Sequence, residues 1–162
     1  CASTPTVLMA VELEVEASLY NGVRLKGRCD RIIMQDGLLT VLDVKTGKVD
    51  SDQIKLPSLD RTAIKPDRQY ALQLLIYLWA YLRQHPEVHQ ASAGVISLQR
   101  PSQEHDLRLT IGDEVVVGRQ RLPAIEGLLA HLVEELLDPA IPFAHDPKSN
   151  YCTCCVGGII ES

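Results

Sequence analysis

The chain has 162 residues, 46% of them hydrophobic and 23% charged, and its formal net charge is −5. This length and composition are typical of one globular domain with a sizeable core. The sequence contains no run of 18 apolar residues, which argues against a membrane span. The negative net charge gives no overall argument for nucleic-acid binding, although an acidic protein can carry a locally basic cleft.

The N-terminus and the cysteines indicate the cellular setting. Residues 1–16 lack the basic start and the apolar core of a signal peptide, and the chain does not begin with Met. We therefore expect residues 1–162 to be a single domain that belongs to a longer chain. The five cysteines are an odd number, and Cys152, Cys154 and Cys155 are crowded together. This is not the pattern of a secreted disulfide framework, and it favours a reducing cytoplasm.

The N-terminal part of the chain predicts three antiparallel strands. Apolar and acidic residues alternate from residue 8 to 20, as in a half-buried strand. Asn21-Gly22 and Asp36-Gly37 are hairpin signals, so we expect further strands at 23–34 and 38–46. The face that carries Cys29, Arg31 and Ile33 is expected to pack inward, with Cys29 as a small buried hydrophobe.

The second hairpin brings two acidic side chains together. If Asp36 and Gly37 form its loop, Asp30 lies directly opposite Asp43, and paired residues share one face of a sheet. Two facing carboxylates repel, but a divalent cation such as Mg²⁺ between them reverses the sign of that interaction. Lys45 lies two residues beyond Asp43 and so on the same face. Such a set can hold a metal and a water nucleophile against a phosphate.

Two alternatives stay open for this hairpin. Its acidic and basic side chains can simply form a solvated face. A three-residue loop from Gln35 to Gly37 would instead stagger the two carboxylates and weaken the case for a metal.

Residues 49–66 show no clear period and predict an excursion or flexible loop. The segment carries scattered positive charge at Lys55, Arg61 and Lys65. We interpret it as a solvated loop rather than as a DNA clamp.

The strongest helix signal follows over residues 68–85, where Asp67 suits the N-terminal turn. The expected apolar stripe is Leu72, Leu75, Ile76, Trp79 and Leu82. On another side of the helix, Gln69, Gln73 and Tyr77 recur at four-residue spacing. This polar line fits either hydrogen bonding to loops or contact with a phosphate backbone and the ligands of the site.

The C-terminal half predicts more strands and a second helix. Residues 92–99 are typical of a buried strand inside a sheet, and 106–111 and 114–117 are strand material. Residues 122–137 predict a long helix with Pro123 in its first turn and His131 at the surface. Its expected core stripe is Leu128, Leu129, Leu132, Val133 and Leu136.

Three motifs in this order resemble the PD-(D/E)XK nuclease superfamily, and more narrowly its RecB-like exonuclease branch, which includes helicase–nuclease subunits of the AddB type. The matches are Gly27, Asp30 and Arg31 to a G-x-x-D-R strand, Asp43, Lys45, Thr46 and Gly47 to a D-x-K-T-G strand, and Gln73 and Tyr77 to a Q-x-x-x-Y helix. The resemblance covers about residues 10 to 155. It implies a restriction-endonuclease-like α/β fold, in which a mixed β-sheet opened by an antiparallel meander is flanked by α-helices.

The resemblance also implies residue roles. Asp30 and Asp43 are expected to be metal ligands, with the Val44 carbonyl completing part of the shell, and Lys45 positions or activates the attacking water. The polar line on the helix is expected to lie against the site and the DNA backbone. The implied chemistry is hydrolysis of DNA with Mg²⁺ or Mn²⁺ in repair or recombination, by an exonuclease rather than an endonuclease. The expected partner besides DNA is a helicase or another subunit of a repair complex.

The chain departs from this branch at two places. Relatives usually carry a metal-binding His before the first strand, and residues 1–16 contain none. Many relatives also hold a [4Fe–4S] cluster through four cysteines; here Cys152 and Cys155 fit part of the pattern, but Glu161 stands at the next expected position. Free thiols are therefore favoured over a cluster or a structural zinc. Two further hypotheses are a catalytically impaired nuclease-like module for DNA binding or subunit contact, and a thiol-based metal-binding domain.

Overall fold

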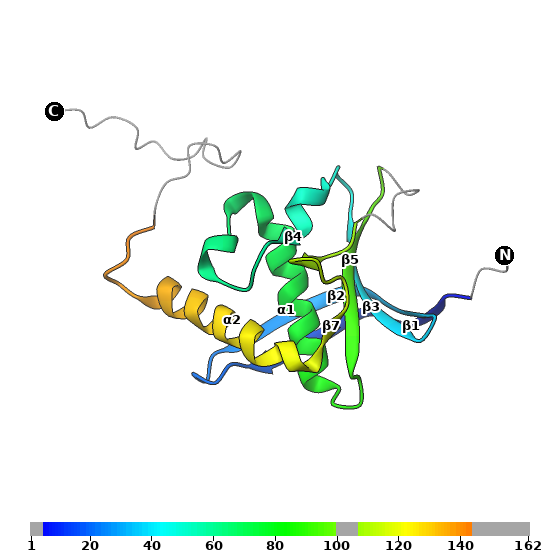
Figure 1. Ribbon diagram of the computed structural model, residues 1–162, viewed down its shortest axis with the longest axis horizontal. Helices are drawn as coiled ribbons and strands as arrows, with labels where there is room; N and C mark the ends of the chain where they lie inside the picture. The colour runs from blue at the N-terminus through cyan, green and yellow to red at the C-terminus, as the bar shows by residue number, and fades with distance from the viewer. Residues whose placement is uncertain (1–4, 100–106, 144–162) are drawn as a thin grey trace.

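A mixed five-stranded sheet forms the centre of the protein (Figure 1). The computed structural model describes residues 5–99 and 107–143. The strands follow the order β1-β2-β3-β5-β7 across the sheet. Their bounds are Val7–Ser18 (β1), Arg24–Gln35 (β2), Leu38–Lys45 (β3), Gln90–Ser97 (β5) and Val117–Gly118 (β7). The first three are antiparallel, β5 runs parallel to β3, and β7 runs antiparallel to β5. The predicted meander and the internal position of the buried strand are confirmed.

The turn between β2 and β3 fixes their register. Asp36 has a φ of +52° and Gly37 a φ of +75°, the two left-handed residues that a two-residue type I′ hairpin loop requires. Gln35 consequently pairs with Leu38, and the same register continues to Arg31 and its partner on β3. The two-residue loop is therefore confirmed, and the staggered three-residue alternative is wrong.

The inward face of β2 differs from the prediction. Cys29 is fully buried as expected, but Arg31 is exposed and Ile33 is half-buried, whereas Ile32 is buried. Cys29 and Ile32 are both buried although they are three residues apart, and residues at an odd spacing lie on opposite faces of a regular strand. The strict alternation of the strand is therefore interrupted between them. On the neighbouring strand β1, Glu12 has a φ of +47°, which a strand residue rarely adopts. A local irregularity of this kind re-aims the side chains around it.

Two long helices pack beside the sheet (Figure 1). Helix α1 (Gln69–Gln84) follows a short 3₁₀ turn at Pro66–Arg68 and lies against the strands, and α2 (Leu122–Leu137) packs beside α1. Both helices are confirmed within a residue or so, and His131 is exposed as expected. The apolar stripes need correction: Leu72 and Ile76 of α1 are only half-buried, and Leu136 of α2 is 59% exposed.

The prediction of a flexible loop over residues 49–66 is wrong. The segment contains the 3₁₀ turns Ser51–Ile54 and Arg61–Ala63 and strand β4 (Lys55–Leu56), which pairs in parallel with β6 (Thr110–Ile111). Four apolar residues anchor the segment in the core, namely Val49, Ile54, Leu56 and Ala63. They have no regular spacing, so periodicity alone does not reveal them.

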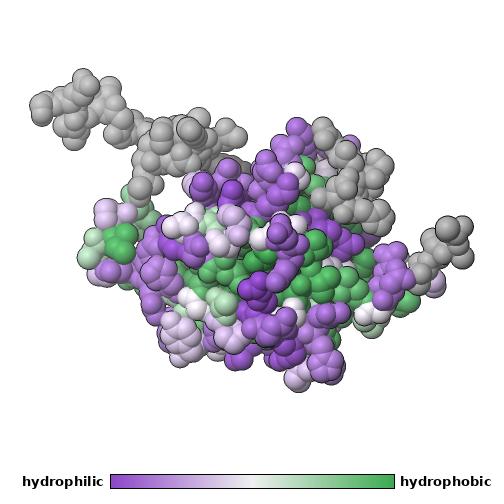
Figure 2. Space-filling model, in the orientation of Figure 1, coloured by the Kyte–Doolittle hydropathy of each residue, from purple (hydrophilic) through white to green (hydrophobic). Residues whose placement is uncertain are grey.

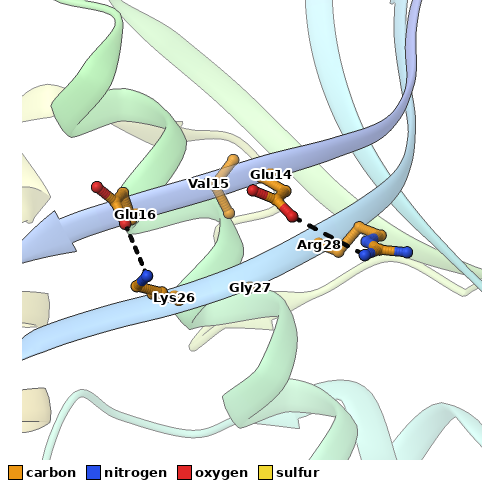
Figure 3. Close-up of a pocket in the computed structure, with 6 residues that line it drawn as sticks. All are labelled: Glu14, Val15, Glu16, Lys26, Gly27 and Arg28. Carbon is orange, nitrogen blue, oxygen red and sulfur yellow. Dashed lines mark ion pairs between the residues drawn. The ribbon is translucent and has the colours of Figure 1, made fainter.

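Hydrophilic side chains border a band of hydrophobic ones on the face seen in Figure 2, in the region where α1 and the strands beside it lie. On the hairpin β1–β2, ion pairs cross between the strands, and Figure 3 shows two of them: Glu16 with Lys26 at 3.5 Å and Glu14 with Arg28 at 3.8 Å. No helix in the described part of the chain is long and apolar enough to cross a membrane.

Candidate active site

Strands β2 and β3 carry Asp30 and Asp43 to neighbouring positions. The ladder between the strands ends at the pair of Arg31 and Leu42, and Asp30 and Asp43 are the residues next to that last pair. The Asp30 carboxylate reaches across to β3, where its Oδ2 accepts a hydrogen bond of 2.6 Å from the backbone N–H of Val44. In a strand the carbonyl of a residue leaves on the same edge as its N–H. The Val44 carbonyl therefore lies on the edge of β3 that faces Asp30.

The Asp43 side chain is buried between β3 and α1. The residue is 4% exposed, and its Oδ1 accepts a hydrogen bond of 3.2 Å from Nε2 of Gln73. Its Oδ2 lies 2.8 Å from Nζ of Lys45 in an ion pair, and this contact opposes the effect of burial on the Asp43 pKa. A carboxylate has about four acceptor positions, so Asp43, held by Gln73 and Lys45, can still bind a cation or water.

Gln73 links the acidic and basic groups of the site. Its Oε1 accepts a hydrogen bond of 3.0 Å from Lys45, and its Nε2 donates both to Asp43 and, at 2.7 Å, to the hydroxyl of Tyr77. All polar atoms of the Gln73 amide therefore have partners, which fixes its orientation. Helix α1 thus supplies the side chains that hold Asp43 and Lys45 of the sheet in place.

Tyr70 is a member of the site that the sequence analysis missed. Nζ of Lys45 lies 5.0 Å from the centroid of the Tyr70 ring, within the range of a cation–π contact. The sequence feature that could have identified Tyr70 is its spacing: Tyr70 precedes Gln73 by three residues, so the two residues share one side of the helix. Gln69, by contrast, is exposed and lies outside this network of described side chains, in a hollow next to Gln73 and Tyr77.

The protonation of the site follows from burial and from the two carboxylates. Burial raises the pKa of Asp43 above its usual value of 3.8, Lys45 opposes this effect, and the nearby Asp30 carboxylate adds to it. Cys29 lies in the same field: burial, followed by Asp43 and Asp30, raises its pKa to about 12. Its thiol is therefore neutral at physiological pH, which agrees with a packing role and not with that of a nucleophile.

The donor set of this site fits a hard divalent cation. Within residues 5–99 and 107–143, no group of three or more His, Cys, Asp and Glu side chains is placed to hold a metal. Mg²⁺, however, is commonly bound through one or two carboxylates and keeps several waters. The carboxylates of Asp30 and Asp43 and the carbonyl of Val44 supply such oxygen ligands. Cys152 and Cys155 lie outside the described residues.

Comparisons with known proteins identify the family of this chain. A search of curated proteins finds no match. Among solved structures, a crystal structure of SSO0001 is similar at 16% sequence identity, with a TM-score of 0.35; the alignment covers 83% of this chain and 61% of that one. The family model of the PD-(D/E)XK nuclease superfamily matches residues 2–156, nearly the whole chain. The mixed sheet with its flanking helices is consistent with the restriction-endonuclease-like fold of that family. This chain belongs to the PD-(D/E)XK nuclease superfamily.

Proposed function

We propose that the protein is a metal-dependent deoxyribonuclease of the RecB-like branch, which uses Mg²⁺ or Mn²⁺ to hydrolyse DNA and acts as an exonuclease in repair or recombination. We further propose that residues 1–162 form one nuclease domain, with a helicase or another repair subunit as partner. The observation that carries the proposal is the buried carboxylate of Asp43, which is held by Gln73 and Lys45 and lies close enough to Asp30 for that carboxylate to raise its pKa.

A carboxylate is buried at a cost that a purely structural site would avoid. Two acidic residues in one register repel each other, and burial adds to that cost, as the raised pKa of Asp43 indicates. A divalent cation held by Asp30, Asp43 and the Val44 carbonyl would offset both effects. Since Asp30, Asp43 and Lys45 are all present, we favour an enzyme over the catalytically impaired binding module.

The other side chains would act on the substrate and its water. A bound divalent ion supplies Lewis-acid polarisation of the scissile phosphate and lowers the pKa of bound water. The Lys45 ammonium, held by Gln73 and Tyr70, provides a positive charge next to the attacking water and the phosphate. Tyr77 fixes the Gln73 amide through its hydroxyl and so keeps Lys45 and Asp43 oriented.

The test is DNA cleavage with end-labelled single- and double-stranded DNA in Mg²⁺, Mn²⁺ or EDTA. We expect cleavage only with the metals, and release of mononucleotides from an end rather than internal fragments. Asp43→Asn and Lys45→Met should each lower the rate at least about a hundredfold, the usual effect of removing one group that stabilises a transition state.

A second acidic–basic pair provides the matched control. Asp52 and Lys55 form an exposed ion pair of 3.2 Å that has no hydrogen bond to the network of Asp43, Lys45 and Gln73. Asp52→Asn or Lys55→Met should therefore leave the rate unchanged. Circular dichroism of every variant separates lost chemistry from lost folding. Cleavage that persists in EDTA, or in folded Asp43→Asn protein, would show that this site is not the nuclease centre.

A further inference from the structure

A hollow of about 340 Å³ lies between β2 and α1, next to the proposed active site. Its lining residues are Lys26, Gly27, Gln69, Leu72, Gln73, Ile76 and Tyr77. This volume falls in the lower part of the range of pockets that bind small ligands, about 300–1,000 Å³. Gly27 allows the Tyr77 ring to approach β2 closely at the wall of the hollow, because a Cβ there would come within 2.3 Å of that ring.

The chemistry of the lining combines an apolar surface with polar groups. Leu72 and Ile76 of α1 pack against the edge of the core and also line the hollow, so they are only half-buried. The amides of Gln69 and Gln73 offer hydrogen-bond donors and acceptors beside them. An apolar surface with a few convergent polar groups is the usual composition of a specific ligand site.

The hollow is continuous with the candidate active site. Gln73 and Tyr77 line it and also belong to the hydrogen-bond network that holds Asp43 and Lys45. A group that occupies the hollow therefore lies one side chain away from the proposed metal ligands. Such a group belongs to the substrate.

The charge at the mouth fits an anionic substrate. The Lys26 side chain is 63% exposed, and its ammonium lies 3.5 Å from Glu16, an exposed pair that solvent screens (Figure 3). A phosphate that approaches can therefore draw Lys26 away from Glu16 at little cost. The mouth of the hollow then offers a cation for the backbone, and its interior offers apolar and amide groups.

We propose that this hollow binds one unpaired nucleobase of the DNA next to the bond that is cut, so that the substrate is single-stranded or frayed DNA. A base has apolar faces and hydrogen-bonding edges, which match Leu72, Ile76 and the two amides. In a duplex those faces are stacked and the edges are paired, so a base can enter only after it leaves the stack. This inference rests on the proposed nuclease function and adds its substrate preference.

The test is binding of short fluorescein-labelled oligonucleotides, measured by fluorescence anisotropy in Ca²⁺, together with cleavage in Mg²⁺. We expect the protein to bind single-stranded DNA more tightly than a blunt duplex of the same sequence. An abasic site moved along the strand should weaken binding about tenfold at one position, the equivalent of one lost base contact. Ile76→Ala and Leu72→Ala should weaken binding of the intact strand but not of the strand with that abasic site.

The control is Leu136→Ala, which makes the same change at an exposed leucine of α2 away from the hollow. It should bind every oligonucleotide as the unchanged protein does. Blunt duplex bound as tightly as single strands, no sensitivity to an abasic site at any position, or no DNA binding at all would each overturn the base-binding hollow. If metal-dependent cleavage persists in those cases, only this inference fails. If binding follows our expectation but no metal cleaves the DNA, the proposed nuclease function fails instead.

Discussion

Gly27 is the residue whose missing side chain shapes the site most directly. The Tyr77 ring occupies the space where a Cβ of residue 27 would lie, at 2.3 Å from Cε1. Gly27→Ala should therefore displace this ring and, through Gln73, disturb Asp43 and Lys45. We expect a loss of about 1–3 kcal/mol in the free energy of unfolding, as is usual for overpacking, and a lower cleavage rate. Urea denaturation and the DNA cleavage assay measure the two effects.

Two further variants test the cause. Tyr77→Ala introduced together with Gly27→Ala should restore part of the lost stability, because the double variant removes the clash. Gly127→Ala on α2 is the matched control: a Cβ there meets nothing within 4 Å, and alanine favours a helix over glycine. Equal losses in Gly27→Ala and Gly127→Ala would contradict the role of the Tyr77 ring.

Gly37 sets the register that brings Asp30 opposite Asp43. Its φ of +75° lies in the left-handed region, which costs any residue with a Cβ about 1–2 kcal/mol. Gly37→Ala should lower the free energy of unfolding by that amount. Gly47→Ala provides a control, since Gly47 has open space around it and no positive φ. Denaturation curves of the two variants should differ by the cost of the strained turn, and curves that coincide would show that the turn does not constrain the hairpin.

The elements show which parts of the fold local signals can predict. Asp36-Gly37 forms a turn of two residues, which leaves one register and brings Asp30 and Asp43 to the end of the same ladder. Asn21-Gly22 also marks a turn, but this turn is longer: only Gly22 has a positive φ, and the N–H of Leu19 donates to the carbonyl of Val23. The helices follow from their 3.6-residue period. These signals are local, and each acts within a few residues along the chain.

The parts that escaped prediction depend on contacts distant in sequence. Strand β4 exists because β6, more than fifty residues later, pairs with it, and a two-residue strand has no period to detect. Arg31 is exposed together with Val11, its partner on the neighbouring strand, and the β1–β2 register shifts between Leu8 and Ala10, which the residue pattern of β2 alone does not reveal. Tyr70 joins the site only because the Lys45 side chain extends from the sheet toward α1.

The 49–66 segment is tied to α2 by one paired contact. Arg61 donates two hydrogen bonds to the Glu135 carboxylate, of 2.5 and 2.7 Å, and these bonds hold the pKa of Glu135 below its usual 4.5. A carboxyl with a lowered pKa stabilises the folded state above its ordinary pKa, and this contribution is lost as the pH falls through the lowered value.

We therefore expect Arg61→Met to be less stable than the unchanged protein at neutral pH, by an amount that shrinks as the pH falls below about 4.5. Urea denaturation at neutral and acidic pH measures this difference. Lys55→Met is the control, because Lys55 pairs with Asp52, only three residues away in the same segment, and forms no hydrogen bond or ion pair with the described residues of α2. A difference between Arg61→Met and the unchanged protein that is independent of pH would show that the ion pair is not its cause.

For the whole molecule, the candidate site opposes stability in the absence of a cation. Burial and Asp30 raise the pKa of Asp43, so the ionised carboxylate is disfavoured in the folded state at neutral pH. Asp43→Asn removes this charge and keeps a group that can accept from Gln73. Lys45 loses its ion pair, but its side chain is 24% exposed and retains Gln73 and Tyr70. In EDTA we therefore expect Asp43→Asn to be at least as stable as the unchanged protein.

Mg²⁺ should reverse that order. A ligand that binds only the folded state stabilises it by about 2.7 kcal/mol when its concentration is a hundred times its dissociation constant. Asp43→Asn should lose most of this gain, because asparagine lacks the negative charge of the aspartate carboxylate. Thermal unfolding with and without Mg²⁺ measures the effect without relying on cleavage. Asp52→Asn, which changes an exposed carboxylate, should respond to Mg²⁺ as the unchanged protein does. If Mg²⁺ stabilised Asp43→Asn as much as the unchanged protein, the metal would bind elsewhere. If Mg²⁺ reverses the order of stability, Asp30 and Asp43 serve to bind the cation, and the protein without the cation is less stable because of them.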